Sequence, residues 1–94
     1  MRIVYLPSAQ QGLEWFARYY GENFPEGAAR AATSLAKAEA VLASQPGAGQ
    51  AITETEGVRR LRIERTPFSL VYRHVADRVE VLRIWDARSR GLAL

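Results

Sequence analysis

The chain has 94 residues, enough for a single hydrophobic core, so we expect residues 1–94 to form one domain. Its apolar fraction of 48% predicts a packed core and excludes disorder, and the absence of cysteine excludes disulfides, thiolate metal sites and a cysteine nucleophile. The positive net charge of +3 favours nucleic acid or an acidic protein as a partner, and the lack of cysteine favours a reducing cytoplasm.

The N-terminal part predicts a strand followed by a helix. Residues 2–6 favour a short strand, because Ile3 and its neighbours suit a pleated surface and Pro7 ends the run. This apolar run is too short for a signal peptide or a membrane span, so we expect no membrane contact. Ser8 is the candidate N-cap of the helix, and Pro25 closes it. The apolar stripe of this helix consists of Ala9, Leu13, Phe16, Tyr20 and Phe24.

A second helix is predicted over residues 27–44. Its many alanines give it a high helix propensity and keep it thin, so it can approach a neighbour closely. One face carries Ala31, Leu35, Ala38 and Leu42. The two helices therefore form a helical hairpin, and the Pro- and Gly-containing residues 46–57 form a loop.

The remainder predicts three antiparallel strands. Residues 58–64, 68–75 and 79–85 are rich in β-favouring side chains, and residues 76–78 connect the last two. The last two strands are apolar on parts of both faces, so we expect helices on one face and another cover on the second. Residues 87–94 predict an irregular tail. The order β-α-α-β-β-β predicts an α+β fold with a helical hairpin packed on a small, mostly antiparallel sheet.

The late strands, in this order, resemble the ParE/RelE family of plasmid-stabilisation toxins. The segments that carry the resemblance are Val58-Arg59-Arg60-Leu61-Arg62-Ile63, Phe68-Ser69-Leu70-Val71-Tyr72-Arg73 and Val81-Leu82-Arg83-Ile84-Trp85. The family has a strand ending in basic residues, a strand with a Tyr-Arg pair and a strand reading Val-Leu-Arg-Val-x-His. The resemblance covers about residues 2 to 88. It implies a type II toxin in a hetero-oligomeric complex with a cognate antitoxin, whose C-terminal segment wraps it.

Positive charge is concentrated in the second half of the chain. Residues 1–57 carry four basic and six acidic side chains, whereas residues 58–94 carry nine arginines and four acids. Such a surface can be simply solvated, but it also suits phosphate or carboxylate groups of a target. The candidate target-binding residues are Arg60, Arg62, Arg65, Arg73, Arg83, Arg88 and Arg90.

The resemblance implies two alternative targets. One branch inhibits DNA gyrase by binding, and the other cleaves messenger RNA in the ribosome. Cleavage would need cations together with proton-transfer groups. The candidates for that role are Arg62, Arg73, Arg83, His74 and Tyr72. Where the family frequently has His after the last strand, this chain has Asp86, which favours gyrase inhibition over an endoribonuclease. A non-toxic antitoxin-binding module is a further alternative.

Two aromatic side chains are candidates for antitoxin binding. Trp15 and Tyr19 are four residues apart, on a face next to the core stripe of the first helix. They could simply widen the apolar face, or they could form an exposed patch that the antitoxin covers, since Trp and Tyr are enriched at binding hot spots. The sequence has none of the phosphate-loop or metal-binding motifs, so we expect neither a cofactor nor a metal.

Overall fold

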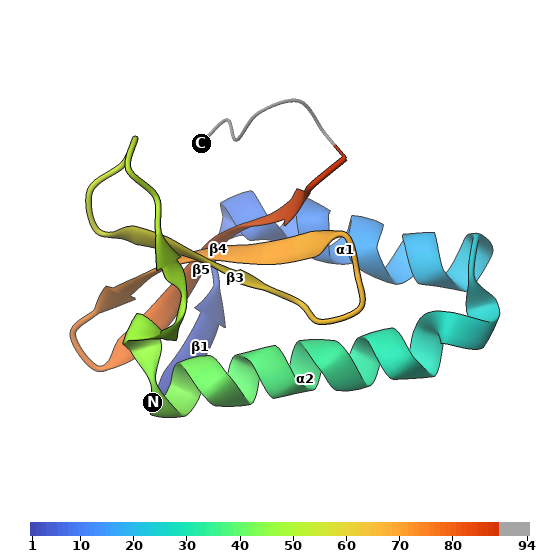
Figure 1. The fold of residues 1–94 in the computed structure, drawn as a ribbon, viewed down its shortest axis with the longest axis horizontal. Coiled ribbons are helices and arrows are strands. Elements are labelled where there is room, and N and C mark those ends of the chain that lie inside the picture. The colour runs from blue at the N-terminus through green and yellow to red at the C-terminus, as the bar shows by residue number, and fades with distance from the viewer. Residues whose placement is uncertain (89–94) are drawn as a thin grey trace.

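The computed structural model describes residues 1–88 of the chain (Figure 1). Two helices and five strands follow one another along the chain, with a short 3-10 turn after each helix. The elements are β1 (Arg2–Tyr5), α1 (Pro7–Glu22), a 3-10 turn (Pro25–Gly27), α2 (Ala28–Ser44), a second 3-10 turn (Pro46–Ala48), β2 (Gln50–Ala51), β3 (Val58–Arg62), β4 (Phe68–Val75) and β5 (Arg78–Asp86).

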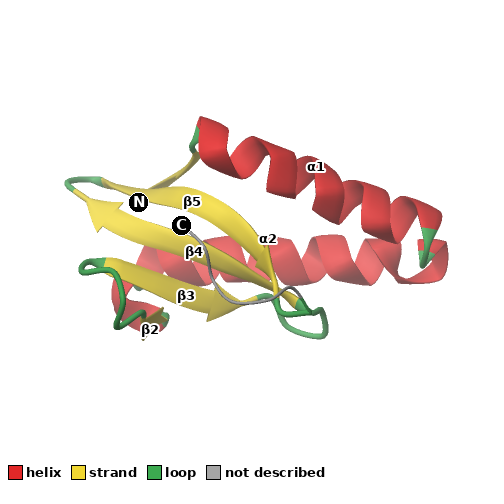
Figure 2. Ribbon diagram, turned by 90° about the horizontal axis from the view of Figure 1, so that it is seen from above, coloured by secondary structure: helices red, strands yellow, loops and turns green. Residues whose placement is uncertain are grey.

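The strands form one mixed sheet in the order β1-β5-β4-β3-β2. β1 pairs with β5 in parallel, and all other neighbours are antiparallel. The helices lie on one side, with α1 alongside β5 and α2 behind the sheet (Figure 2). The α+β prediction of a helical hairpin on a small, mostly antiparallel sheet is therefore confirmed. Neither helix in the described part of the chain has the length and apolar character that crossing a membrane requires.

The core lies between the helices and the sheet. Its buried members from the helices are Ala9, Phe16, Ala31, Ala38 and Leu42. Its buried members from the sheet side are Ile63, Phe68, Leu70, Tyr72, Val79, Val81 and Ile84. The stripes predicted for both helices are confirmed except at Phe24, which is 47% exposed. Phe24 leaves the stripe because α1 ends at Glu22 and the chain then turns toward α2.

Several element ends differ from the prediction. Ser8 is not an N-cap, because α1 already begins at Pro7, whose fixed φ suits the first helical position. The Ser8 hydroxyl instead donates to the Leu82 carbonyl oxygen at 2.6 Å. β2 lies inside the predicted loop, and its two residues are too few to produce an alternating pattern. β3 ends two residues early, while β5 is one residue longer at each end than predicted.

Candidate functional site

The face of the sheet that points away from the helices carries five arginines of the strands β3, β4 and β5. Phe68, Leu70 and Tyr72 of β4 belong to the core. By strand alternation Ser69, Val71, Arg73 and Val75 point to the other side of the sheet. Residues directly opposite each other in neighbouring strands share a face, and the register places four further arginines opposite these β4 residues. We define the arginine face as Arg60, Arg62, Arg73, Arg78 and Arg83.

Arginine and tryptophan side chains provide the second cover that the sequence predicted. Val71 is 0% exposed although it lies on the outer face, and its cross-strand partners are Arg60 and Arg83. The Arg60 Cζ lies 5.0 Å from the centroid of the Trp85 ring. Long arginine stems can cover apolar surface while the guanidinium stays in water. The outer face is therefore closed by the candidate target-binding residues themselves.

One end of the arginine face is electrically compensated. Glu80 accepts from Arg73 Nε at 2.8 Å and from Arg78 Nε at 2.9 Å, and its side chain is only 8% exposed. The hydrogen bond from Arg73, followed by the one from Arg78, lowers the pKa of the Glu80 carboxyl. One buried carboxylate thus partly neutralises two guanidinium groups at this end.

The other end of the arginine face keeps its positive charge. Arg60, Arg62 and Arg83 make no ion pair within residues 1–88. Arg62 Nε makes one long hydrogen bond, 3.4 Å, to the Thr66 carbonyl oxygen. We call these three arginines, with Trp85 beside them, the open end of the arginine face. Its guanidinium groups can bind phosphate or carboxylate oxygens of a target.

The structure does not bring the two proton-transfer candidates to the arginine face. Tyr72 is buried, and its hydroxyl donates to the Pro46 carbonyl oxygen at 2.7 Å and accepts from Gly49 N at 2.9 Å. Burial raises the pKa of this hydroxyl. His74 pairs with the core residue Val79 and so shares the helix side of the sheet. Its Nε2 lies 3.1 Å from the Ala76 carbonyl oxygen, next to the turn before β5.

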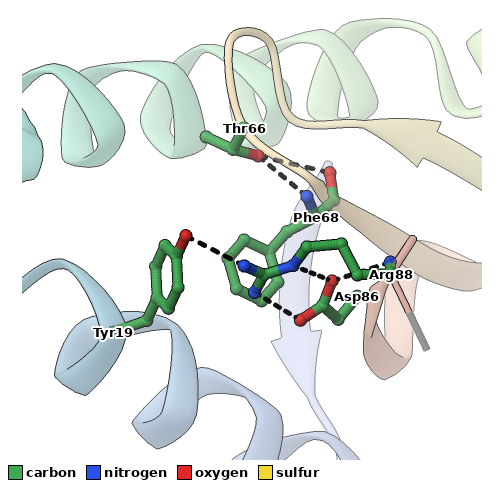
Figure 3. A network of polar contacts seen from close by, with 5 residues as sticks. All are labelled: Tyr19, Thr66, Phe68, Asp86 and Arg88. Atoms are coloured by element: carbon green, nitrogen blue, oxygen red, sulfur yellow. Dashed lines mark hydrogen bonds and ion pairs between the residues drawn. The ribbon is translucent and has the colours of Figure 1, made fainter. Parts of the chain in front are cut away.

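Arg88 lies away from the arginine face, in a network of polar contacts (Figure 3). Its Nε and Nη2 donate to the two oxygens of Asp86 at 2.9 and 2.6 Å, and its Nη1 donates to the Tyr19 hydroxyl at 3.0 Å. The Arg88 Cζ also lies 4.6 Å from the centroid of the Tyr19 ring. The hydrogen bonds from Arg88 lower the pKa of Asp86, and those to Asp86 raise the pKa of Arg88. This network ties the end of β5 to α1.

Two predicted target-binding arginines remain. Arg65 does not join the arginine face, because it lies in the turn between β3 and β4, where it lines a cavity together with residues of both helices. Arg90 lies outside the described residues.

The role of Tyr19 as the partner of Arg88 was missed by sequence reasoning, because the two residues are 69 positions apart and no local pattern links them.

A groove of about 850 Å³ runs between α1 and the end of β5, lined by residues that include Gln11, Trp15 and Arg83. β1 last bonds to β5 through Leu6 N and the Val81 carbonyl oxygen, so the following part of β5 has no strand on this side within the described chain. Trp15 is 41% exposed in this groove, whereas Tyr19 is half-buried against Phe68. The two predicted antitoxin contacts therefore have different surroundings.

The two helices leave a second, smaller groove between them. It has a volume of about 350 Å³ and is lined mostly by apolar residues such as Leu13, Ala32 and Leu35. Glu39 lies at its margin and accepts a hydrogen bond from the Tyr5 hydroxyl at 2.7 Å. Such a groove can take the apolar face of a partner helix.

Among residues 1–88, the structure contains no cluster of His, Asp or Glu that could bind a metal ion.

The chain is similar in sequence and in fold to known proteins. Residues 3–91 match the family model described as the ParE toxin of the type II toxin–antitoxin system parDE. A solved structure of the chromosomal ParDE toxin–antitoxin system from P. aeruginosa is similar, with 30% sequence identity and a TM-score of 0.68. The match covers 89% of this chain and 92% of the other. A search of curated proteins finds no matching sequence.

Proposed function

Because this chain belongs to the ParE toxin family of type II toxin–antitoxin systems, we propose that it inhibits DNA gyrase and that a cognate antitoxin neutralises it. The observation that carries the proposal is the open end of the arginine face. Arg60, Arg62 and Arg83 have no ion-pair partner within residues 1–88 and lie beside Trp85 on one face of the sheet. Inhibition by binding needs shape and charge, and this surface offers both.

The contacts of Tyr72 and His74 support binding over RNA cleavage. Attack by a ribose 2′-hydroxyl requires a proton acceptor, and the leaving oxygen requires a donor, both close to the cations. The Tyr72 hydroxyl is already bonded twice to the backbone, and His74 lies on the helix side of the sheet. Arginine is a poor proton donor or acceptor near neutral pH. The arginine face is therefore better suited to holding a target than to cutting one.

The two grooves support neutralisation by an antitoxin. An amphipathic helix would cover apolar residues between α1 and α2, and an extended segment would lie along β5 beside Trp15. Arg83 borders the groove beside β5 and also belongs to the arginine face. An antitoxin segment in this groove would thus reach a residue that we assign to target binding.

Parallel assays with the purified protein test the proposed target. The protein is incubated with gyrase and relaxed plasmid, and separately with programmed ribosomes, whose RNA ends are mapped by primer extension. We expect loss of supercoiled product and uncut messenger RNA. Codon-positioned cuts that disappear in His74→Ala or Tyr72→Phe would establish a ribonuclease instead.

Expression in a bacterium tests toxicity and neutralisation. We expect the chain alone to slow growth and co-expression of its partner to restore it. Unchanged colony counts with confirmed full-length protein in the cells would instead indicate a non-toxic antitoxin-binding module.

A further inference from the structure

A separate cavity of about 320 Å³ lies where the helical hairpin turns, away from the arginine face. It is formed by the C-terminal part of α1, the N-terminal part of α2 and the turn between β3 and β4. The residues that line it include Tyr19, Tyr20, Phe24, Glu26, Arg30 and Arg65. Its volume is at the lower end of the range of small-ligand sites, about 300–1,000 Å³.

Aromatic rings form one wall of this cavity. The ring centroids of Tyr19 and Tyr20 are 5.0 Å apart, and those of Tyr19 and Phe24 are 5.6 Å apart. Tyr19 and Tyr20 are packed on the core residue Phe68, which fixes their rings. Phe24 is 47% exposed, so part of its ring is available to a ligand. A wall of this kind is suited to a flat, unsaturated ring.

Two arginines supply positive charge to the same cavity. Neither Arg30 nor Arg65 forms an ion pair with another residue in the described part of the chain. Glu26 is the one acidic residue among those that line the cavity. Two uncompensated guanidinium groups are suited to a phosphate, whose oxygens match their planar array of donors.

The backbone conformation at Arg65 makes this position suitable for a test substitution. Arg65 has φ 63°, in the left-handed region that favours glycine. Before β3, the chain has Gly57 in a similar conformation, with φ 78°. At the β3–β4 turn it has Arg65, and in the β4–β5 turn it has Ala76, with φ 53°. Because glycine adopts a positive φ without a steric cost, Arg65 can be replaced by glycine with little effect on this turn.

We propose that this cavity binds one nucleotide, with its base on the exposed part of the Phe24 ring and its phosphate between Arg30 and Arg65. The Glu26 carboxylate would accept hydrogen bonds from ribose hydroxyl or base amino groups. An acidic peptide would satisfy the two arginines but would leave the aromatic wall without a flat partner. The nucleotide site is distinct from the arginine face and does not depend on the identity of the toxin's target.

Calorimetric titration of the purified chain tests the site with three probes. Adenosine monophosphate carries both groups, adenosine lacks the phosphate and ribose 5-phosphate lacks the base. We expect the monophosphate to bind at least about tenfold more tightly than either fragment, because charge-assisted hydrogen bonds and stacking both contribute. Equal binding of adenosine and its monophosphate, or no binding of the monophosphate, would overturn the proposal.

Arg65→Gly is the decisive variant, because glycine relaxes the positive φ and the protein should remain at least as stable in thermal unfolding. We expect this variant to bind the monophosphate about tenfold or more weakly. The matched control is Arg18→Ala, which removes an exposed arginine of α1 that does not line the cavity and should leave binding unchanged. Wild-type affinity in Arg65→Gly, or tighter binding of an aspartate-rich peptide than of the monophosphate, would refute a nucleotide site.

Discussion

Arg60 of β3 reaches across β4 to the ring of Trp85 on β5, with its Cζ 5.0 Å from the ring centroid. The two side chains lie opposite Val71 and Ser69, and both of these β4 residues are buried beneath them. A cation over an indole ring is stabilised by about 0.5–1 kcal/mol at an exposed site. This contact holds one guanidinium of the open end in a defined position.

Arg83→Ala should weaken gyrase inhibition. Arg83 belongs to the open end and forms no ion pair within residues 1–88, so its removal takes away charge without exposing a buried acid. Loss of a central arginine contact typically costs about 1–2 kcal/mol, which corresponds to roughly 5- to 30-fold more protein for half-inhibition of supercoiling. His74→Ala is the control and should change this concentration less than about twofold. Equal potency of Arg83→Ala and wild type would exclude the open end as the contact surface.

Trp15→Ala should weaken the antitoxin complex without unfolding the protein. Trp15 is 41% exposed and lines the groove beside β5, so we expect a loss of about 1–4 kcal/mol of binding free energy by calorimetry. Tyr19→Ala should lower both affinity and melting temperature, because Tyr19 packs on Phe68 and binds Arg88. Tyr19→Phe separates these effects, since it keeps the ring and removes the hydroxyl. Unchanged affinity of Trp15→Ala for the antitoxin would show that Trp15 does not contribute to that interface.

Glu80→Gln should reduce stability near neutral pH and much less in acid. The arginines lower the folded-state pKa of Glu80, so its stabilisation is present above the unfolded value of about 4.5 and is lost as the pH falls through the folded value. The melting-temperature difference between wild type and variant should therefore shrink as the pH is lowered from 7 through the range below 4.5. Glu64→Gln is the control, because its pair with Lys37 is 3.8 Å long and about 70% exposed. A difference that stays constant with pH would contradict a charged role for Glu80.

Gly12→Ala and Gly21→Ala, two substitutions in α1, should have opposite effects on stability. A Cβ at Gly12 would lie 3.2 Å from the Ile84 Cβ and carbonyl oxygen, so α1 would have to move away from β5. Overpacking of this kind costs about 1–3 kcal/mol. A Cβ at Gly21 would meet nothing within 4 Å, and alanine is favoured over glycine in a helix by about 0.5–1 kcal/mol. Denaturant unfolding measures both, and stabilisation by Gly12→Ala would mean that the two elements are not in close contact.

Sequence patterns predicted correctly the features that depend only on the residues of a single helix or strand. The helical stripes and the three late strands follow directly from periodicity, and alternation along β4 correctly separates Arg73 from His74. β2 was missed because two paired residues carry no period. Phe24 was misplaced because a stripe gives no signal of where a helix ends.

The contacts of the candidate site depend on segments far apart in the chain, which periodicity does not address. Glu80 meets Arg73 only because the β4–β5 register sets them opposite each other. The Arg88 contact to Tyr19 joins the last described residue to the first helix. Both arginines were predicted to bind a target, but the contacts of Arg73 with Glu80 and of Arg88 with Tyr19 become visible only in the folded chain.

The parallel pairing of β1 with β5 has a consequence for synthesis on the ribosome. β1 is translated before the other strands of the sheet, yet within residues 1–88 it pairs only with β5, so it has no pairing edge until residues 78–81 have been made. Sheets that join distant segments fold slowly, because the chain must close a long loop before the contact is gained. β5 also carries Arg83 and Trp85. A nascent chain therefore completes its sheet and presents its arginine face at nearly the same moment, after β5 has been made.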